Sequence, residues 1–310
     1  MKKSGGDRSA AVDLVVVGSV ALDTVETSES RWTERLGGSV SYACAAARLF
    51  ARTGMVGVVG TDFPAAHCNL YRRLGIDTAG LQVAEGRTFR WSGVYEPDMI
   101  NRRTLSTELN VFAGFRPDLP ASYTEATFVL LGNIAPALQL HVLSQMRHAR
   151  FVSADTMDLW IRTACEDLKK VIRKVDMLAV NDSEARLLTG AHNLKEAGRR
   201  ILQMGPRYVA IKKGEHGALL MGEGGMTIFP AYPVDSVRDP TGAGDAFAGA
   251  CMGVLAAHGR VTPSVVREAM VLGSVVASYA VEAIGLDGLS RLTRRQVEAR
   301  GRALMAMSPR

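Results

Sequence analysis

Residues 127–181 carry three short apolar runs, TFVLLG at 127–132, FVSAD at 151–155 and MLAVN at 177–181. Helical patterns at about 137–147 and 158–174 lie between these runs. Continuous apolar strands that alternate with helices are typical of a parallel sheet with helices on both faces. The stretch therefore predicts an α/β fold with a doubly wound, mostly parallel sheet.

The same rhythm extends outward in both directions. Toward the N-terminus the sequence predicts a buried strand at 13–18, an Ala-rich helix that opens at Gly37-Gly38 and ends at Gly54, a strand at 55–60 and a helix at 65–74. Toward the C-terminus it predicts helices at 182–189 and 194–204, a hairpin of strands 208–213 and 217–222 around Gly214, and helices at 243–258, 263–283 and 292–305. Because no repeat or long linker interrupts the pattern, we expect residues 1–310 to form a single domain.

Two segments depart from this rhythm. Residues 19–36 are polar and irregular, whereas 87–112 alternate apolar and polar residues in TFRWSGVYEP and RRTLSTEL. Such alternation predicts two antiparallel strands with one exposed face. We expect these two segments to form a small β appendage on the single domain.

The composition excludes several classes of protein. Of the 310 residues, 47% are hydrophobic and 22% charged, which excludes wholesale disorder. The net charge of +6 suits an anionic ligand, but no basic arm indicates nucleic-acid binding. The four cysteines and six histidines are scattered, which favours free thiols over a disulfide framework or a zinc site. The charge-poor segment 241–259 contains Asp245 and favours a buried helix over a membrane span, so we expect a cytoplasmic protein with no membrane or nucleic-acid partner.

The segment RDPTGAGDAF at 238–247 gives the strongest chemical signal. Gly242, Ala243 and Gly244 are expected to open a helix whose free N–H groups attract an anion. Asp245, just inside that helix, is suited to remove a proton from a hydroxyl that attacks a phosphorus atom. Taken alone, the segment also fits an ordinary glycine-rich helix start.

The common nucleotide-binding motifs are excluded. The dinucleotide pattern GxGxxG fails because Phe247 occupies the third glycine position, and no Gly-Lys pair exists to form a Walker A loop. The chain therefore lacks the glycine pattern of a dinucleotide-dependent oxidoreductase. If the chain transfers phosphate, it must bind the phosphate groups through a different backbone segment.

Two further segments follow predicted strands. Asn181 and Glu184 form an NxxE pair that could hold hydrated Mg²⁺ beside phosphates, although a plain helix cap has the same pattern. The run KKGEHG at 212–217 joins a lysine at a strand end to a glycine turn, a pattern that also fits a hairpin with solvated lysines.

Together, in this order, these segments resemble the ribokinase (PfkB) family of carbohydrate and nucleoside kinases. The family signature D-T-x-G-A-G-D is matched, apart from local variation, by Asp239-Pro-Thr-Gly-Ala-Gly-Asp245, and its N-terminal Gly-Gly pair by Gly37-Gly38. Its N-x-x-E and G-x-x-G motifs are matched by Asn181 to Glu184 and by Gly214 to Gly217. The resemblance covers residues 13 to about 290.

The resemblance implies a ribokinase-like fold and an ATP-dependent kinase of a small-molecule acceptor, with the β appendage as a lid and a homodimer contact. Asp245 would be the catalytic base, and Gly242, Ala243 and Gly244 the anion hole. The other implied roles are Mg²⁺ and phosphate binding through Asn181 and Glu184, nucleotide binding through Lys212, Gly214, Gly217 and Ser274, K⁺ binding through Asp239, and acceptor binding through Asp23, Gly37, Gly38 and Tyr42.

The sequence leaves the chemical identity of the acceptor open. Tyr42 stands where many sugar-specific members have Asn, and Tyr42, Phe89 and Trp91 could stack on a nucleobase or simply pack. The lid arginines Arg87, Arg90, Arg102 and Arg103 could meet a phosphosugar or form a solvated face. We expect a carbohydrate kinase, with a nucleoside kinase as the alternative. A silent ligand-sensing homologue is less favoured because Asp245 and its neighbouring motifs are intact.

Overall fold

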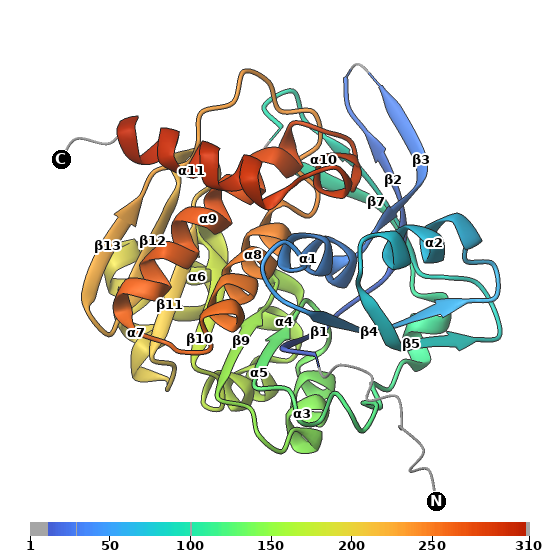
Figure 1. The fold of residues 1–310 in the computed structure, drawn as a ribbon, viewed down its shortest axis with the longest axis horizontal. Coiled ribbons are helices and arrows are strands. Elements are labelled where there is room, and N and C mark those ends of the chain that lie inside the picture. The colour runs from blue at the N-terminus through green and yellow to red at the C-terminus, as the bar shows by residue number, and fades with distance from the viewer. Residues whose placement is uncertain (1–11, 29, 100, 308–310) are drawn as a thin grey trace, which may run out of the picture.

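A large mixed sheet organises the computed structural model, which describes residues 12–28, 30–99 and 101–307. The strand order in this nine-stranded sheet is β13-β12-β11-β10-β9-β8-β1-β4-β5 (Figure 1). All neighbours from β5 to β11 are parallel, and β12 and β13 add antiparallel pairs at one edge. The prediction of a doubly wound, mostly parallel sheet is confirmed. The strands are β1 (Leu14–Val17), β4 (Thr53–Gly60), β5 (Asp77–Ala84), β8 (Phe128–Leu131), β9 (Phe151–Asp155), β10 (Met177–Asn181), β11 (Tyr208–Lys212), β12 (Ala218–Gly222) and β13 (Gly225–Phe229).

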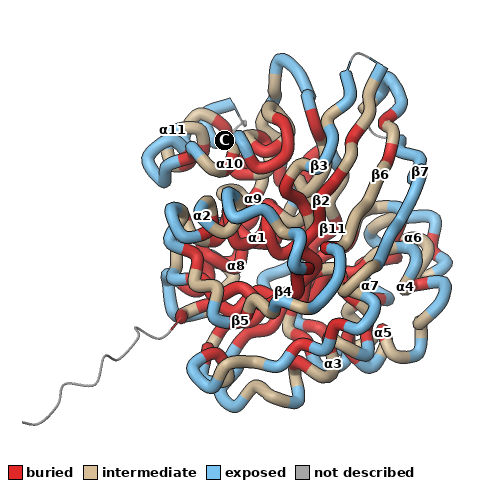
Figure 2. Tube along the Cα trace, turned by 90° about the vertical axis from the view of Figure 1, so that its right-hand side faces the viewer, coloured by how far each residue is buried: buried red, intermediate tan, exposed pale blue. Residues whose placement is uncertain are grey.

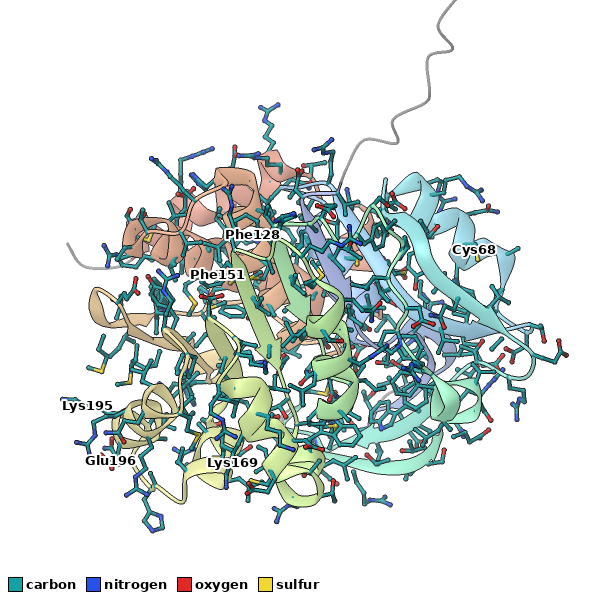
Figure 3. All side chains as sticks on the ribbon, turned by 90° about the horizontal axis from the view of Figure 1, so that it is seen from below. Cys68, Phe128, Phe151, Lys169, Lys195 and Glu196 are labelled. Carbon is teal, nitrogen blue, oxygen red and sulfur yellow. The ribbon has the colours of Figure 1, made fainter. Side chains whose placement is uncertain are left out.

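Helices cover both faces of this sheet because its strands are apolar on both sides. Along β1, Leu14 and Val16 point into one buried cluster and Val15 and Val17 into the other. The first cluster is closed by α1 (Ser39–Ala47), α2 (Ala65–Arg73), α8 (Ala243–His258), α9 (Pro263–Val281), α10 (Asp287–Ser290) and α11 (Arg294–Met307). The second is closed by α3 (Pro136–Gln145), α4 (Asp158–Thr163), α5 (Cys165–Ile172), α6 (Asp182–Thr189) and α7 (Leu194–Gln203). Figure 3 shows Phe128 and Phe151 within the molecule and Lys169, Lys195 and Glu196 at its periphery.

A second, four-stranded sheet stands beside the first. Its order is β3-β2-β6-β7, with β2 and β6 parallel and the outer pairs antiparallel. Its strands are β2 (Ala21–Glu26), β3 (Arg31–Gly37), β6 (Arg90–Tyr95) and β7 (Arg102–Glu108). Every residue of β7 is exposed (Figure 2). We call these four strands the lid, since they come from the two segments expected to form the β appendage.

Three details differ from the sequence prediction. Residues 19–36 were assigned to the β appendage with no strand placed in their irregular pattern, and they contain β2 and most of β3; a bulge between Asp23 and Val25 breaks the alternation that would have located β2. The helix expected at 158–174 is divided at Ala164, whose φ of −137° is not helical. The Ala-rich helix ends at Ala47 instead of reaching Gly54, because Gly54 belongs to β4, where its missing side chain leaves room for the Tyr123 ring.

Several elements were not predicted. They are β5, β13, α10 and two 3₁₀ helices, at Asn110–Gly114 and Gly214–His216. Within the described residues, Pro263–Val281 alone is long and apolar enough to cross a membrane, and half of its most apolar window is buried. This helix packs on α8, where Gly273 lies against Cys251 and Phe247. The described cysteines Cys44, Cys68, Cys165 and Cys251 are all free.

Candidate active site

The glycine-rich segment begins α8 with open backbone donors. Gly242 is the N-cap residue in the left-handed region (φ 74°), and no side chain caps the helix. A Cβ at Gly242 would lie 2.3 Å from the Tyr42 ring, so both the backbone angle and the space require glycine. The Ala243 N–H donates to the Pro240 carbonyl at 3.2 Å, whereas within the described chain no hydrogen bond uses the N–H of Gly242 or Gly244. The helix start therefore presents free donors and the positive end of its dipole to an anion.

Close helix packing sets the position of this helix start. A Cβ at Gly249 would lie 2.2 Å from the Ala43 carbonyl oxygen, and one at Gly253 would lie 2.7 Å from that of Ala47. Small residues thus bring α8 into backbone contact with α1, which begins directly after Gly38. The two glycine motifs, about 200 residues apart in the chain, are held together by this contact.

Asp245 faces a buried ion pair. Lys212, at the end of β11, donates to Asp155 Oδ2 at 2.9 Å, and a Cβ at Gly244 would lie 3.1 Å from Lys212 Nζ. Burial, followed by the Asp155 charge, raises the pKa of Asp245 to about 7, although Lys212 and Arg102 act in the opposite direction. For Lys212, burial alone would lower the pKa, but Asp155 and Glu184 outweigh it and the pKa rises. A carboxyl with a pKa near neutrality can both accept and release a proton.

Asn181 and Glu184 form a complete capping box at the start of α6. Asn181 Oδ1 accepts the Glu184 N–H, and Glu184 Oε2 accepts the Asn181 N–H, both at 2.8 Å. The helix cap that the sequence offered as an alternative for Asn181 and Glu184 is thus present. Yet Glu184 also belongs to the charged cluster, because burial raises its pKa to about 7 while Lys212 lowers it and Asp155 raises it. Glu184 can cap α6 and take part in the charged cluster at the same time.

Asp23 lies in the lid, against the Gly37-Gly38 pair. Asp23 is 6% exposed, and a Cβ at Gly37 would lie 1.8 Å from its Oδ2 atom. Burial, followed by the charge of Asp239, raises the pKa of Asp23 to about 7, while a hydrogen bond from the Gly38 backbone lowers it. The charge of Asp245 also acts on Asp23, which brings the predicted acceptor residue and the predicted base into one electrostatic unit.

The inner face of the lid joins the same site. In register, Trp91 is the neighbour of Asp23 across the parallel pair β2–β6, and Tyr95 is the neighbour of Arg102 across β6–β7. The Tyr95 hydroxyl lies 3.1 Å from Thr241 Oγ1, directly before Gly242. Arg102 lies 5.7 Å from the centre of the Trp91 ring, and its charge lowers the pKa values of both Asp23 and Asp245. Trp91 therefore lies beside Asp23 and Tyr95 beside the glycine-rich segment, and the charge of Arg102 acts on both acids.

The other lid arginines are engaged elsewhere or lie on the exposed strand. Arg87 pairs with Glu108 at 3.3 Å, and Arg90 pairs with Asp62 at 2.8 Å and with Glu34 at 3.1 Å. Arg103 is an exposed residue of β7. Of the four, Arg102 is the one whose charge acts on the acids of the site.

Two predicted site residues are buried under the glycine-rich segment. Tyr42 is 2% exposed, and its ring packs beneath Gly242. Asp239 is also 2% exposed, and its two oxygens accept the N–H groups of Thr241 and Gly285, each at 2.9 Å. Asp239 thus ties the segment before α8 to the loop after α9.

The predicted nucleotide residues occupy two places. Gly214 (φ 56°) and Gly217 (φ 80°) shape the turn after β11, and a Cβ at Gly217 would lie 1.9 Å from the Phe229 carbonyl oxygen. A Cβ at Gly214 would meet nothing within 4 Å, so this turn leaves open space beside Lys212. Ser274 is half-buried on α9, and no hydrogen bond in the described chain links it to the other site residues.

The sequence analysis did not identify Asp155 as a site residue, and it did not predict that the charge of Arg102 acts on the acids of the site. Asp155 ends β9 just as Asn181 ends β10, so the rule that drew attention to strand ends applied equally to it. Its partner Lys212 lies 57 residues away in the chain. No feature of the sequence distinguishes Arg102 from the other lid arginines, because only the strand register shows which arginine lies on the face of the lid that carries Trp91 and Tyr95.

The acids of the site are arranged to bind a hydrated metal ion rather than to coordinate a metal directly. No group of three or more His, Cys, Asp or Glu side chains within the described residues could hold a metal directly. One Asp155 oxygen accepts from Lys212 and the other from the Thr156 N–H, and one Glu184 oxygen accepts from Asn181. This set fits a Mg²⁺ ion that keeps most of its water and phosphate ligands, as Mg²⁺ commonly does.

Comparison with known proteins identifies the family of the chain. The model of the pfkB family carbohydrate kinases matches residues 11–291. A cytidine kinase of Thermococcus kodakarensis is 31% identical over 258 residues, which cover 81% of this chain and 90% of that protein.

Two solved structures have the same fold. A Burkholderia thailandensis nucleoside kinase in complex with inosine is 21% identical, covers 96% of this chain and 100% of its own, and gives a TM-score of 0.76. An E. coli protein assigned as ribokinase II, in complex with ATP and Mg²⁺, is 16% identical, covers 94% of this chain and 99% of its own, and gives 0.78. With the family model covering most of the chain and a relative above 30% identity, this chain belongs to the pfkB family of carbohydrate kinases and is a phosphotransferase.

Proposed function

We propose that the protein transfers the γ-phosphoryl group of ATP to a hydroxyl of a small sugar or sugar-like acceptor, with Asp245 as the base. One observation carries the proposal. Asp245 lies in the first turn of a helix with free backbone donors, and burial holds its pKa at about 7. A base poised near neutrality beside an anion-binding helix start is what the attack of a hydroxyl on a phosphoryl group requires.

The residues around Asp245 bind the phosphate groups and the Mg²⁺ ion in this proposal. The N–H groups of Gly242 and Gly244 stabilise negative charge on the transferring group, and Lys212 supplies a fixed positive charge beside Gly244. Asp155 holds Lys212 in place at 2.9 Å. Glu184 and Asp155 orient the water shell of Mg²⁺, which, when bound, neutralises phosphate charge. Asp239 holds the segment before the anion hole, where the resemblance places a K⁺ site.

Asp23 recognises the acceptor. Its carboxylate is buried next to Gly37, where the absence of a side chain leaves room for the carboxyl group itself. A buried carboxylate accepts hydrogen bonds from two neighbouring hydroxyls and rejects molecules that lack them. Sugars and ribosides both carry such a pair.

A nucleoside acceptor is the second candidate, and the lid gives it specific support. Trp91 is the lateral neighbour of Asp23 on the inner face of the lid, so a base attached to a ribose at Asp23 would lie against its ring. The similarity to a cytidine kinase and the fold shared with an inosine-bound nucleoside kinase favour the same class.

A substrate panel tests the proposal. ATP consumption is measured with sugars, phosphosugars, sugar acids and nucleosides, using the wild type, Asp245→Asn and Asp23→Ala. We expect one acceptor class to react, Asp245→Asn to lower kcat by at least about 10²-fold, and Asp23→Ala to lower kcat/KM for the acceptor by a similar factor. Near-normal turnover by Asp245→Asn would remove the base from the mechanism.

The lid variants then decide between the candidates. Trp91→Ala should weaken a nucleoside acceptor selectively, whereas a simple sugar should be affected little. Arg102→Gln should reduce turnover of an anionic acceptor more than that of a neutral one, with Arg103→Gln as the matched control on the same strand. Equal losses for both Arg variants would exclude a specific role for Arg102.

A further inference from the structure

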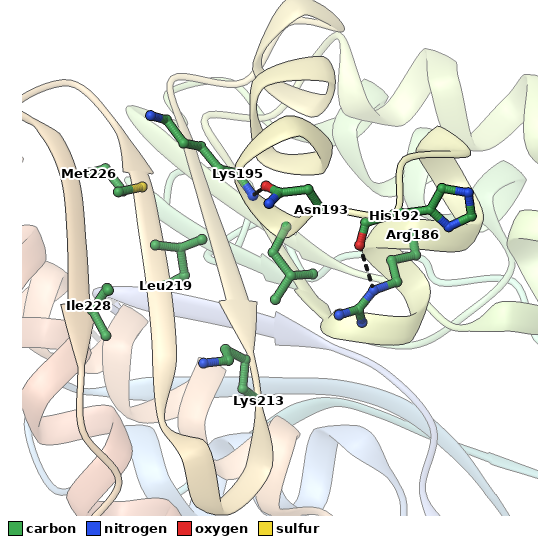
Figure 4. Close-up of a pocket in the computed structure, with 9 residues that line it drawn as sticks. Arg186, His192, Asn193, Lys195, Lys213, Leu219, Met226 and Ile228 are labelled. Carbon is green, nitrogen blue, oxygen red and sulfur yellow. Dashed lines mark hydrogen bonds between the residues drawn. The ribbon is translucent and has the colours of Figure 1, made fainter.

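An open cavity lies on the opposite face of the sheet from Asp245. It has a volume of about 420 Å³ and is bounded by the end of β11 and the β12–β13 hairpin on one side and by the α6–α7 segment on the other (Figure 4). Its volume falls within the range of small-molecule sites. None of the roles proposed above for phosphoryl transfer uses it.

Of two consecutive lysines, one belongs to the catalytic centre and the other to this cavity. Lys212 is the last residue of β11, and Lys213 follows it at the start of the turn, where its backbone (φ −129°, ψ 27°) has left the strand conformation. Lys212 turns toward Asp155 on the catalytic side, whereas Lys213 lines the cavity. Leu219 and Ile228, which pair in register across β12 and β13, continue the cavity wall.

The charge of the cavity is positive and largely uncompensated. Arg186, Lys195 and Lys213 line it, and no acidic residue does. Arg186 is already engaged, because it pairs with Asp182 and donates to the His192 carbonyl. Across the described residues, neither Lys195 nor half-buried Lys213 has an ion-pair partner, which leaves two positive charges free.

The opposite side of the cavity is apolar and open to a ligand. Leu219 is 7% exposed, but Met226 and Ile228 on the edge strand β13 are 48% and 69% exposed. Met226 and Ile228 both line the cavity, so their exposed apolar surface is available to the apolar part of a ligand. The start of α7 is not itself the anion site, since the Asn193 side chain caps it by accepting the N–H groups of Lys195 and Glu196.

We propose that this cavity binds a phosphate monoester with an apolar or aromatic body, at a site separate from the phosphoryl-transfer centre. A phosphate monoester carries a charge of about −1.5 to −2 at neutral pH, which matches the two unpaired ammonium groups. Its phosphate contacts Lys195 and Lys213, and its apolar body covers Leu219, Met226 and Ile228. Neither inorganic phosphate nor an uncharged aromatic compound meets both requirements.

The probe is 1-naphthyl phosphate, whose binding is measured by its fluorescence with saturating MgATP present, so that the catalytic nucleotide site is occupied. We expect it to bind at least about tenfold more tightly than either 1-naphthol or inorganic phosphate. Lys195→Gln combined with Lys213→Gln should weaken binding by about tenfold or more, and added salt should weaken wild-type binding. Ile228→Ser should weaken the naphthyl probe and leave inorganic phosphate unchanged.

Lys174→Gln, which removes an exposed lysine of the α5–β10 connection outside the cavity, is the matched control and should bind like the wild type. Equal binding by the wild type and the double lysine variant would overturn the proposal, as would equal affinity for 1-naphthyl phosphate and 1-naphthol. The exposed edge could instead be covered by a second copy of the chain. A dimer in sedimentation that Ile228→Ser converts to a monomer would likewise overturn the proposal.

Discussion

At the scale of single residues, three acids of the site have a pKa raised to about 7, and two of them, Asp23 and Asp245, are the proposed acceptor-binding residue and the proposed base. Burial holds the pKa of Asp23 and the pKa of Asp245 at about 7, well above the ordinary aspartate range. A base must be ionised to accept a proton, and only an ionised carboxyl offers both oxygens as acceptors to two hydroxyls, because the protonated form turns one oxygen into a donor. Both proposed roles are therefore lost as the pH falls below about 7.

This property predicts the pH profile. With MgATP saturating, kcat/KM for the acceptor should rise between pH 5 and 7 with a slope approaching two on a logarithmic scale, and then level off. Asp23→Asn removes one titrating group, so the lower activity that remains should rise with a slope of about one. Steady-state kinetics at constant ionic strength measures both slopes. A flat wild-type profile from pH 5 to 8 would contradict the assignment of either acid.

The same burial predicts an effect on stability. In the folded chain the pKa of Asp245 is about 7, whereas in the unfolded chain the carboxyl loses its proton near the ordinary pKa of 3.8. Ionised Asp245 therefore costs stability progressively as the pH rises from about 4 to 7. Asp245→Asn cannot ionise and should raise Tm at pH 8 by about 2–5 °C, although we expect it to lower turnover strongly.

The control for this prediction is the pH itself. At pH 4 the native carboxyl is protonated, so the difference in Tm between the variant and the wild type should disappear. Thermal unfolding monitored by circular dichroism at both pH values measures the difference. A variant that is less stable than the wild type at pH 8 would show that Asp245 contributes favourable contacts that outweigh its burial.

At the scale of elements, the contact between α1 and α8 places both glycine motifs. Gly249 has no room for a side chain, because its Cβ would lie 2.2 Å from the Ala43 carbonyl oxygen. Gly249→Ala must therefore push the helices apart, at a cost of about 1–3 kcal/mol. We expect Tm to fall by several degrees and kcat to fall with it, because the anion hole moves relative to Asp23.

A matched variant separates this effect from the general cost of replacing glycine. Gly114→Ala adds a Cβ that meets nothing within 4 Å, in a short 3₁₀ helix away from α8. Its Tm and kcat should stay close to those of the wild type. Similar losses in the two variants would mean that the α1–α8 contact has no special role.

At the scale of the whole molecule, the lid has an open outer edge. Every residue of β7 is exposed, and Leu105 and Leu109 are 46% and 47% exposed. Unpaired edge strands with apolar side chains associate with other chains unless they are covered. We propose that two lids pair, so that light scattering should give twice the 33.3 kDa mass of the chain.

Leu105→Glu places a charge in the proposed interface and should give a monomer of unchanged thermal stability. Leu159→Glu is the matched control, since Leu159 is 44% exposed on α4 and lies outside the lid. A wild-type protein that is monomeric at all concentrations would contradict the pairing of the lids.

The sequence alone determined the inner strands of the large sheet and the residues of the motifs, but not the edge strands β5 and β13. The apolar runs that end in Gly18, Asp155 and Asn181 have a local cause, since a strand buried on both faces must be apolar throughout. The helix start at Gly242 also has a local cause, because its positive φ favours glycine, whereas the tight space beside the Tyr42 ring arises only on folding. Asp245, Asn181 and Lys212 are therefore recognisable from the order and type of the residues around them.

Only the tertiary structure decided how these residues act together. The pair of Lys212 and Asp155 joins residues 57 apart, and the inward position of Arg102 depends on strand register, which a one-residue shift would reverse. Residues 19–36 were expected in the β appendage, but the positions of their strands were not predicted, because a bulge between Asp23 and Val25 interrupts their alternation. The raised pKa values of Asp23 and Asp245 arise from burial, and burial is a property of the folded chain: a carboxyl is removed from water by residues that the sequence places far away and only folding brings close.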